Sequence, residues 1–311
     1  MRTDHYYDSC GAGKIHYCRW TPEGEVKGIL QIVHGIAEFV ERYDNFANYL
    51  NTLGYLVVAE DHMGHGKSIG EGSIQGYFHR GWFAAVDDTC RLMKDTMAEY
   101  PGVPYVLFGH SMGSFMARTI LAKYPDSGIT AAVICGTGWQ PSAALPVLIK
   151  VVEGICKATG ETNPSEKLQQ MVFGGYNKRI ANPRTPCDWL TRDEQIVDAY
   201  VADPLCGFTP ACGLLRDMMK GIHYVQQPKN LKNMKKHLPV LFIAGQEDPV
   251  GPYGKGVEKA AEAFKKAGMI NVACKLYPDC RHEILNEFDR ETVYADMLAY
   301  VEQQIEGKRD K

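Results

Sequence analysis

The sequence contains no long apolar run. No stretch approaches the roughly 18 consecutive apolar residues of a membrane-spanning helix. The N-terminal stretch MRTDHYYDSCGAGK has no apolar centre, which argues against a signal peptide there. The basic residues do not gather with interleaved aromatics, and the formal net charge is −3, so we expect no nucleic-acid partner. These absences predict a cytoplasmic globular protein.

The ten cysteines include no Cys-x-x-Cys pair. The closest spacings are Cys206/Cys212 and Cys274/Cys280, each with five residues between them. This spacing is not typical of a zinc site. Several cysteines, such as Cys135, lie in apolar runs and resemble small core residues. We therefore expect reduced thiols, no structural disulfides, no metal and no other cofactor.

Short apolar runs alternate with stretches of helical periodicity along most of the chain. Strands are predicted at 15–20, 26–33, 55–60, 103–109, 129–136, 238–245 and 272–278. Helices are predicted at 41–54, 83–102, 114–128, 256–268 and 291–307. This alternation indicates an α/β fold, with a mostly parallel sheet covered by helices on both faces.

Residues 139–225 interrupt the alternation. They contain helical and loop patterns but no buried strand. We therefore predict a core made of residues 1–138 and 226–311, with residues 139–225 inserted as a helical cap. Within the insertion, residues 143–156 (AALPVLIKVVEGIC) are apolar on nearly every side. Such a helix is either buried or presents an apolar surface to a ligand or a membrane.

The stretch FGHSMGS places Ser111 between Gly109 and Gly113. An apolar strand pattern precedes it and a helical pattern follows it. Strand, Gly-x-Ser-x-Gly and helix together predict a nucleophile elbow, in which the serine occupies a strained turn. Side chains at the two glycine positions would collide there.

A serine hydroxyl needs a general base, and the base needs an orienting acid. In this arrangement the chain order is serine, then acid, then histidine. Asp248 follows the strand predicted at 238–245, and His282 follows the strand predicted at 272–278. We predict Asp248 and His282 as acid and base. Glu247 is the alternative acid.

The negative oxygen that forms during acyl transfer needs preorganised N–H donors. One donor is expected from the residue after the nucleophile, Met112. The second is expected from the loop after an early strand. The stretch QIVHGIAE supplies that loop, with Ile36 as the donor.

The stretch EDHMGHGKS ends like a phosphate-binding loop. That loop needs a glycine five positions before Gly66, and Asp61 stands there instead. We therefore expect no nucleotide site. Asp61, His62 and His65 could also suggest a metal site, but we interpret them as residues that brace a turn beside the active site.

Five motifs in order resemble the monoacylglycerol lipase and lysophospholipase group of serine α/β-hydrolases, which is also described by its serine-aminopeptidase-like domain. They are HGIAEFVERY, AEDHMGHGKSIGE, FGHSMGS, GQEDPVG and RHEILNE. The resemblance covers roughly residues 10–306. It implies an α/β-hydrolase fold with a triad of Ser111, Asp248 and His282.

The resemblance also implies roles for residues outside the triad. Ile36 and Met112 match the oxyanion-hole residues. Glu38 matches a structural acid, and Arg42 matches an arginine that is ion-paired rather than catalytic. Ser114 stands where the group commonly has glycine, a departure that does not threaten the chemistry.

The expected activity is ester hydrolysis of a monoacyl lipid. His110, Leu148 and Val152 are the candidate substrate-binding residues, and the insertion is a candidate for peripheral membrane contact. A short-chain carboxylesterase and an aminopeptidase remain alternatives. An aminopeptidase would need an acidic group for the substrate amine, for which the insertion offers Glu153, Glu161, Asp188 and Asp193. A non-catalytic binding module is disfavoured because the triad is complete. The sequence leaves the leaving group and the oligomeric state open.

Overall fold

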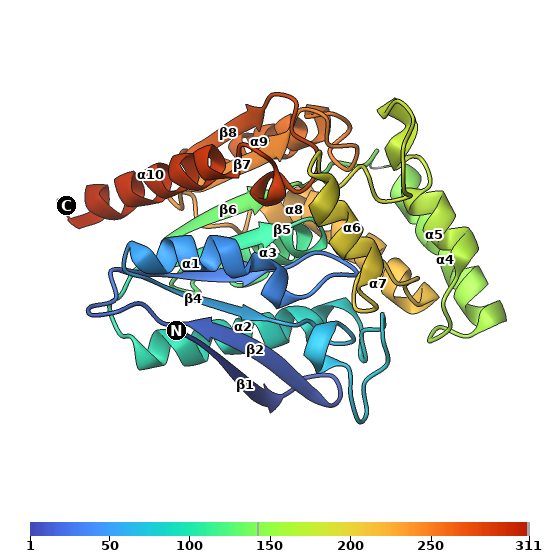
Figure 1. The fold of residues 1–311 in the computed structure, drawn as a ribbon, viewed down its shortest axis with the longest axis horizontal. Helices are drawn as coiled ribbons and strands as arrows, with labels where there is room; N and C mark the ends of the chain where they lie inside the picture. The colour runs from blue at the N-terminus through green and yellow to red at the C-terminus, as the bar shows by residue number, and fades with distance from the viewer. Residues whose placement is uncertain (142, 310–311) are drawn as a thin grey trace.

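A computed structural model describes residues 1–141 and 143–309. Eight strands form one sheet in the order β1-β2-β4-β3-β5-β6-β7-β8 (Figure 1). The strands are β1 (Arg2–Asp8), β2 (Lys14–Trp20), β3 (Gly28–Val33), β4 (Tyr55–Glu60), β5 (Tyr105–His110), β6 (Ala131–Cys135), β7 (Val240–Gly245) and β8 (Val272–Tyr277). Only the pairs β1–β2 and β2–β4 are antiparallel. The remaining pairs are parallel, which confirms the predicted sheet.

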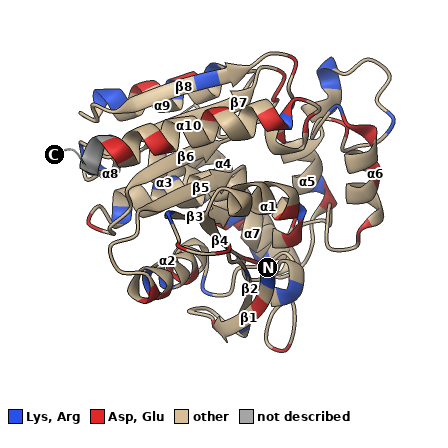
Figure 2. Ribbon diagram, turned by 60° about the vertical axis from the view of Figure 1, so that its left-hand side comes forward, with Lys and Arg blue, Asp and Glu red and all other residues tan. Residues whose placement is uncertain are grey.

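The central strands are buried along their whole length. Every residue of β3, β5, β6 and β7 is buried. These four strands carry no lysine, arginine, aspartate or glutamate, and Figure 2 shows the charged residues gathered around them. Continuous apolar strands of this kind need a helical layer on each face of the sheet.

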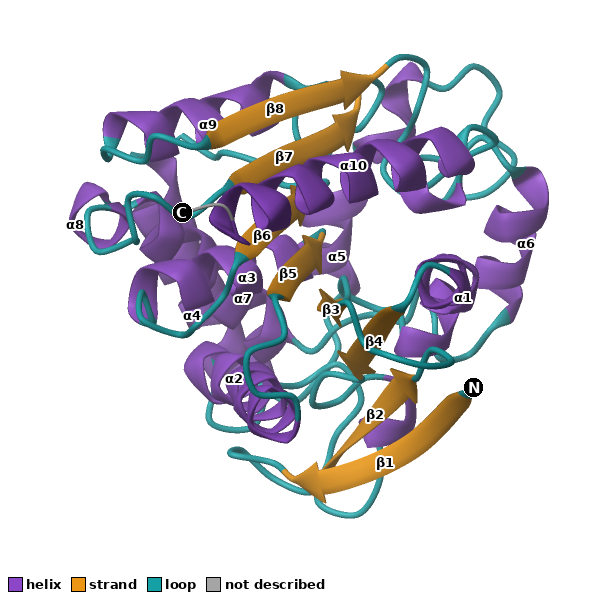
Figure 3. Ribbon diagram, turned by 90° about the vertical axis from the view of Figure 1, so that its left-hand side faces the viewer, coloured by secondary structure: helices purple, strands orange, loops and turns teal. Residues whose placement is uncertain are grey.

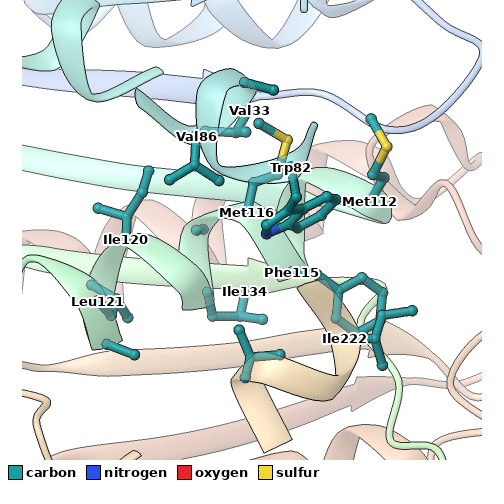
Figure 4. Close-up of a cluster of buried hydrophobic side chains, with 14 of the residues drawn as sticks. Val33, Trp82, Val86, Met112, Phe115, Met116, Ile120, Leu121, Ile134 and Ile222 are labelled. Carbon is teal, nitrogen blue, oxygen red and sulfur yellow. The ribbon is translucent and has the colours of Figure 1, made fainter. Parts of the chain in front are cut away.

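Helices cover both faces of the sheet (Figure 3). One face packs against α1 (Asp44–Thr52) and α10 (Arg290–Arg309). The other packs against α2 (Trp82–Glu99), α3 (Met112–Lys123) and α9 (Lys255–Lys266). Figure 4 shows part of this second core, to which Trp82 of α2, Met116 of α3 and Ile134 of β6 belong.

The chain between β6 and β7 is helical. It contains α4 (Ala144–Thr159), α5 (Glu166–Phe173), α6 (Glu194–Ala202), α7 (Cys212–Gln226) and α8 (Pro228–Leu231). Among the described residues of this stretch no strand forms, as predicted. Figure 1 shows α4, α5 and α6 on the side toward which the parallel strands point. In open parallel sheets this is the side on which ligands bind. We call residues 139–225 the helical segment.

The structure differs from the predictions mainly at the N-terminus. β1 was not predicted, because most of its side chains are exposed at the sheet edge and leave no apolar pattern. The helix predicted at 41–54 is a 3-10 turn (Val40–Tyr43) followed by α1. The helix predicted at 114–128 begins at Met112 and ends at Lys123, two residues before Pro125.

Candidate active site

Ser111 occupies the sharp turn between β5 and α3. Its φ is 53° and its ψ is −121°, a region that costs free energy for any residue with a side chain. Glycine is required on both sides of it. A Cβ on Gly113 would lie 1.9 Å from a carbonyl oxygen of β3, and one on Gly109 would lie 2.5 Å from the Gly113 carbonyl oxygen. The predicted steric need for the two glycines is therefore confirmed.

His282 and Asp248 meet beyond the ends of β8 and β7. His282 Nδ1 lies 3.0 Å from Asp248 Oδ2, and both side chains are buried. The other carboxylate oxygen of Asp248 accepts a hydrogen bond from the Val250 amide at 2.8 Å. A proton on Nδ1 leaves Nε2 as the basic nitrogen. Nε2 has no hydrogen-bond partner among the described residues, and His282 lines the same cavity as Ser111. The side chain of Glu247 is exposed.

Neighbouring groups fix the ring of His282. It lies between the rings of His110 and Trp189, with centroid separations of 4.7 and 5.0 Å. Its backbone amide donates to the Trp189 carbonyl oxygen at 3.3 Å. A Cβ on Gly136, whose φ is 59°, would lie 3.0 Å from the imidazole. Sequence reasoning missed Trp189 and Gly136, and a glycine directly after a buried strand was the one available signal.

The loop after β3 lies against the serine. A Cβ on Gly35 would lie 3.0 Å from the Ser111 Cβ. The Gly35 amide donates to Glu38 Oε1 at 2.6 Å, which fixes the loop one residue before Ile36. On the other side, Met112 is the first residue of α3, so its N–H has no acceptor within the helix. Ile36 and Met112 line one cavity together with Ser111.

A buried ionic network joins this loop to the histidine. Arg42 Nη1 lies 2.7 Å from both Glu38 Oε2 and Glu283 Oε1, and Arg42 Nη2 lies 2.7 Å from Glu283 Oε2. Glu283 directly follows His282 in the chain. The predicted ion pairing of Arg42 is confirmed, whereas its partner Glu283 was not predicted. One guanidinium thus connects the loop of Gly35 with the loop of His282.

The network also contains His110. Its Nδ1 lies 3.2 Å from Glu38 Oε1 and 3.0 Å from the Tyr43 hydroxyl. Its Nε2 lies 3.4 Å from the His282 carbonyl oxygen. Burial favours the neutral imidazole, but the hydrogen bond with Glu38 and the negative charges of Glu38 and Glu283 outweigh burial and raise the pKa of His110.

The two carboxylates are ionised in this network. Burial opposes the ionisation of Glu38, yet the hydrogen bond from His110 and the charge of Arg42 hold its pKa well below the ordinary value. Burial likewise opposes ionisation of Glu283, and the charge of Arg42 lowers its pKa. The positive charge of Arg42 and the hydrogen bond between Glu38 and His110 thus offset the negative charge of the two carboxylates. Such balance is what permits charged groups to be buried.

Two cavities meet at Ser111. The larger, the mixed cavity, has a volume of about 440 Å³ and is lined by apolar side chains such as Leu190, Val201 and Phe208 as well as by polar ones. Its polar lining side chains include Glu38, His110, Gln169, Gln170, Thr209 and Glu283. The smaller, the apolar cavity, has a volume of about 220 Å³. Its lining includes Phe115, Leu145, Leu148, Met218, Met219 and Ile222. Ile36, Ser111, Phe173 and Trp189 line both cavities. The serine therefore faces two cavities, of which the larger carries most of the polar side chains.

The predicted substrate-binding residues occupy different places. His110 lines the mixed cavity and Leu148 lines the apolar cavity. Val152, one turn further along α4, is fully buried in the hydrophobic core and lines neither cavity. The sequence could not separate the two positions, because α4 is apolar on both faces.

The acidic residues of the helical segment lie outside both cavities. Glu153 pairs with Lys220 at 2.7 Å, and Glu161 pairs with Arg216 at 2.6 Å. Asp188 accepts hydrogen bonds from its own loop, and Asp193 caps the N-terminus of α6. None of the four lines either cavity. This placement offers no acid for a substrate amine.

Asp61 fixes the turn after β4. Its carboxylate accepts hydrogen bonds from the amides of Val40 and Lys67, both at 2.9 Å, and lies 2.7 Å from His16 Nδ1. The rings of His62 and His34 stack with centroids 4.0 Å apart. The interpretation that these residues brace a turn beside the active site agrees with these contacts.

Every helix in the part of the chain that the structure describes is too short or too polar to span a lipid bilayer.

The chain is similar to known esterases and lipases along its length. It matches the family described as "Serine aminopeptidase, S33" over residues 24–289. It is 38% identical over 294 residues to the monoglyceride lipase of Homo sapiens, a match that covers 89% of this chain and 86% of that protein. It is 27% identical over 303 residues to the monoacylglycerol lipase of Mycolicibacterium smegmatis, covering 96% and 97% of the two chains.

Solved structures agree with the sequence matches. A thermostable carboxyl esterase from Bacillus coagulans, in complex with glycerol, superposes with a TM-score of 0.90 at 29% identity, covering 98% of this chain and 99% of that one. These matches confirm the resemblance and the α/β-hydrolase fold predicted from the motifs. The chain belongs to the esterase and lipase family of serine α/β-hydrolases that includes the monoglyceride lipases.

Proposed function

We propose that the protein hydrolyses carboxylic esters of monoacyl lipids, either monoacylglycerols or lysophospholipids. The observation that carries this proposal is the meeting at Ser111 of the apolar cavity and the mixed cavity, which adds polar side chains to an apolar lining. An ester placed there can put its acyl chain among the apolar side chains and its alcohol among the polar ones. The human relative's name, monoglyceride lipase, supports the same substrate class.

The proposed reaction is a two-step acyl transfer. His282 Nε2 takes the proton of Ser111, and Ser111 Oγ attacks the ester carbonyl carbon. Asp248 holds the imidazole orientation and stabilises the imidazolium. The alcohol leaves with the proton from His282, and water, activated by the same nitrogen, releases the carboxylic acid. No cofactor takes part in these steps.

The amides of Ile36 and Met112 are the proposed donors to the oxyanion. The hydrogen bond from the Gly35 amide to Glu38 supports this role, because it fixes the loop that carries Ile36. The start of α3 supports the role of Met112, since the partial positive charge of a helix N-terminus favours developing negative charge.

The helical segment is proposed as a cap that selects the substrate. Its helices supply Leu145, Leu148, Met218, Met219 and Ile222 to the apolar cavity. The opposite face of α4 exposes Val147 and Val151, which are 65% and 50% exposed. This exposed apolar face supports peripheral contact with a lipid surface.

A short-chain carboxylesterase is the second candidate. The small volume of the apolar cavity, about 220 Å³, favours it. So does the similarity to the Bacillus coagulans carboxyl esterase. The two candidates use the same triad and differ only in the acyl chain that they accept.

The test is the chain-length dependence of kcat/KM. Purified protein is assayed on monoacylglycerols and simple esters from acetate to long acyl chains, with Ser111→Ala as the blank. A rise toward medium or long chains supports the lipid substrate, and a maximum at acetate or butyrate rejects it in favour of the carboxylesterase. Lysophospholipids with the same acyl chain then distinguish the two headgroups. Retention of most activity by Ser111→Ala would reject the mechanism itself.

A further inference from the structure

Arg118 is a charged residue that the proposed reaction does not use. It lies on α3, one helical turn after Phe115, and is 0% exposed. Among the described residues no carboxylate forms an ion pair with it. Rings of Phe115, Trp139 and Phe264 lie 5.4–5.9 Å from its guanidinium carbon. Burial lowers its pKa, which reflects the cost of placing this charge in the interior.

The hydrogen bonds of Arg118 reach both ends of the helical segment. Nη1 donates to Thr137 Oγ1 at 3.0 Å and to the Gly138 carbonyl oxygen at 3.1 Å. Nη2 reaches the Val225 carbonyl oxygen at 3.5 Å. Thr137 and Gly138 lie where the chain leaves β6, and Val225 lies at the end of α7, where the chain returns toward β7. One side chain of the core thus binds both connections, that is, the two places where the helical segment joins the core.

A second side chain ties the two connections to each other. The Gln140 amide donates to Gln226 Oε1 at 2.8 Å, and Gln226 Nε2 donates to the Gln140 carbonyl oxygen at 2.9 Å. The side-chain amide of Gln226 therefore makes the same pair of hydrogen bonds that the backbone of a neighbouring strand would make. Gln226 is 3% exposed, so little water competes for these bonds.

The walls of the apolar cavity start at these connections. Gln140 and Leu145 line it on the outgoing side, and Met219 and Ile222 of α7 line it on the returning side. Phe115 lines it from α3, and Figure 4 shows Phe115 beside Ile222. The distance from α3 to each of these two walls is therefore set where the helical segment joins the core.

We propose that Arg118 and Gln226 are positioning residues that clamp the two connections of the helical segment to α3 and thereby set the width of the apolar cavity and the acyl chain it accepts. The second half of this inference rests on the proposed ester hydrolysis. The first half concerns the fold alone and can be tested without substrate.

Arg118→Lys separates charge from geometry. Lysine keeps the positive charge, but its single ammonium nitrogen cannot reach both connections as the two guanidinium nitrogens do. In Gln226→Leu the side chain keeps a similar shape, and both hydrogen bonds to Gln140 are lost. Lys220→Met is the matched control. It removes the ion pair with Glu153 that joins α7 to α4 at the surface, on the same helix as Val225 and Gln226 but more than one turn before them.

Two measurements are made on each variant. The first is hydrogen exchange of the backbone amides of residues 138–140, which we expect to accelerate by about tenfold or more in Arg118→Lys and Gln226→Leu. The second is the ratio of kcat/KM for long and short esters. We expect this ratio to change by about tenfold, mainly through the KM of the long ester, with kcat for the short ester within about twofold of wild type. Lys220→Met is expected to match wild type in both measurements.

The outcomes are distinct. Unchanged exchange in both variants overturns the clamp. Faster exchange with an unchanged ratio overturns its role in selecting the acyl chain. If the wild-type protein shows no ester hydrolysis, the proposed function fails, and the exchange measurement still decides whether the clamp exists. Should one variant fail to fold, the other completes the test.

Discussion

The strands beneath Ser111 and the helices beyond it differ in how completely they are buried. Every residue of β5, β6 and β7 is buried, whereas the sixteen-residue α4 buries four residues and the eight-residue α5 buries one. Ser111 and Asp248 follow the ends of the buried strands β5 and β7, and His282 follows the edge strand β8, of which only Tyr277 is buried. The apolar cavity, in contrast, takes much of its lining from the sparsely buried helices.

This difference separates the two tasks of the proposed enzyme. Groups that react must keep their relative positions within a fraction of an ångström, and closely packed strands hold them there. Groups that select an apolar chain act through shape and area, which tolerate adjustment. Changes around the reacting groups should therefore affect all substrates equally. Changes in the helical segment, or in Arg118 and Gln226 that hold it, should affect substrates according to chain length.

The largest effect on kcat/KM is expected from a methyl group placed against the imidazole ring of His282. In Gly136→Ala the new Cβ would lie 3.0 Å from the His282 ring, in a backbone conformation that alanine disfavours. We expect kcat/KM to fall by about a hundredfold or more for esters of every length, because a small displacement of a catalytic group is enough for that loss.

The control for this prediction is the same substitution in α4. A Cβ on Gly154 meets no atom within 4 Å, so Gly154→Ala should leave activity unchanged and stabilise the helix by about 0.5–1 kcal/mol. Equal activity of the two variants would contradict the distinction between the regions. A length-dependent loss in Gly136→Ala would contradict it as well.

A smaller effect is expected from the ionic network. Glu283→Gln keeps the shape of the side chain but removes one of the two carboxylates around Arg42. The loop of His282 should loosen, and kcat should fall by about tenfold on all esters while KM changes little. Steady-state kinetics on one short and one long ester measures this. A loss confined to KM would show that Glu283 does not position the histidine.

The sequence predicted the core better than the site around it. The order of strands and helices, the elbow and the two loops that carry Asp248 and His282 have local signals in glycines, apolar runs and chain order. Trp189, Gly136 and Glu283 matter through residues far away in the chain, such as His282 and Arg42. No local pattern shows these contacts, because they form only when the sheet and the helical segment come together.

The helical segment shows the same limit. The apolar pattern of α4 predicted a helix but could not assign its faces. Leu148 lines the apolar cavity, Val152 lies in the core and Val151 faces outward. All three are apolar, so hydrophobicity alone could not separate them. Only the packing of α4 against α7 decides which face each side chain occupies.

A matched pair on α4 tests this assignment. In Leu148→Asp a charge enters the apolar cavity, and kcat/KM for long-chain esters should fall by about tenfold while short esters change less than about threefold. Val151→Asp places the same charge on the exposed face. It should leave hydrolysis of dissolved esters unchanged and weaken binding to phospholipid vesicles, measured by co-sedimentation. Equal losses of kcat/KM on short and long esters in Leu148→Asp would show that the apolar cavity does not bind the acyl chain.

The smallest effect on catalysis is expected from Asp88, which lies on α2 in the core and lines neither cavity. Its side chain is 1% exposed and accepts hydrogen bonds from the Cys10 amide and the Ser9 hydroxyl. Burial and the negative charge of Glu60 raise the pKa of Asp88 from 3.8 to about 6. The folded protein therefore binds this proton more tightly than the unfolded chain does, and stability is lost as the pH rises from about 4 to about 6.

Asp88→Asn should remove this contribution, because the amide keeps an acceptor for the Cys10 N–H and cannot ionise. The difference in unfolding free energy between the variant and wild type should grow by about 2 kcal/mol between pH 4 and pH 6.5. Denaturant titrations at several pH values measure it, with Asp95→Asn, an exposed position on the same helix, as the control. The ratio of kcat/KM for long and short esters should stay at the wild-type value. A changed ratio would mean that the packing of the core alters the apolar cavity. The proposed separation between the reacting groups and the helical segment would then be wrong, even for a residue that lines neither cavity.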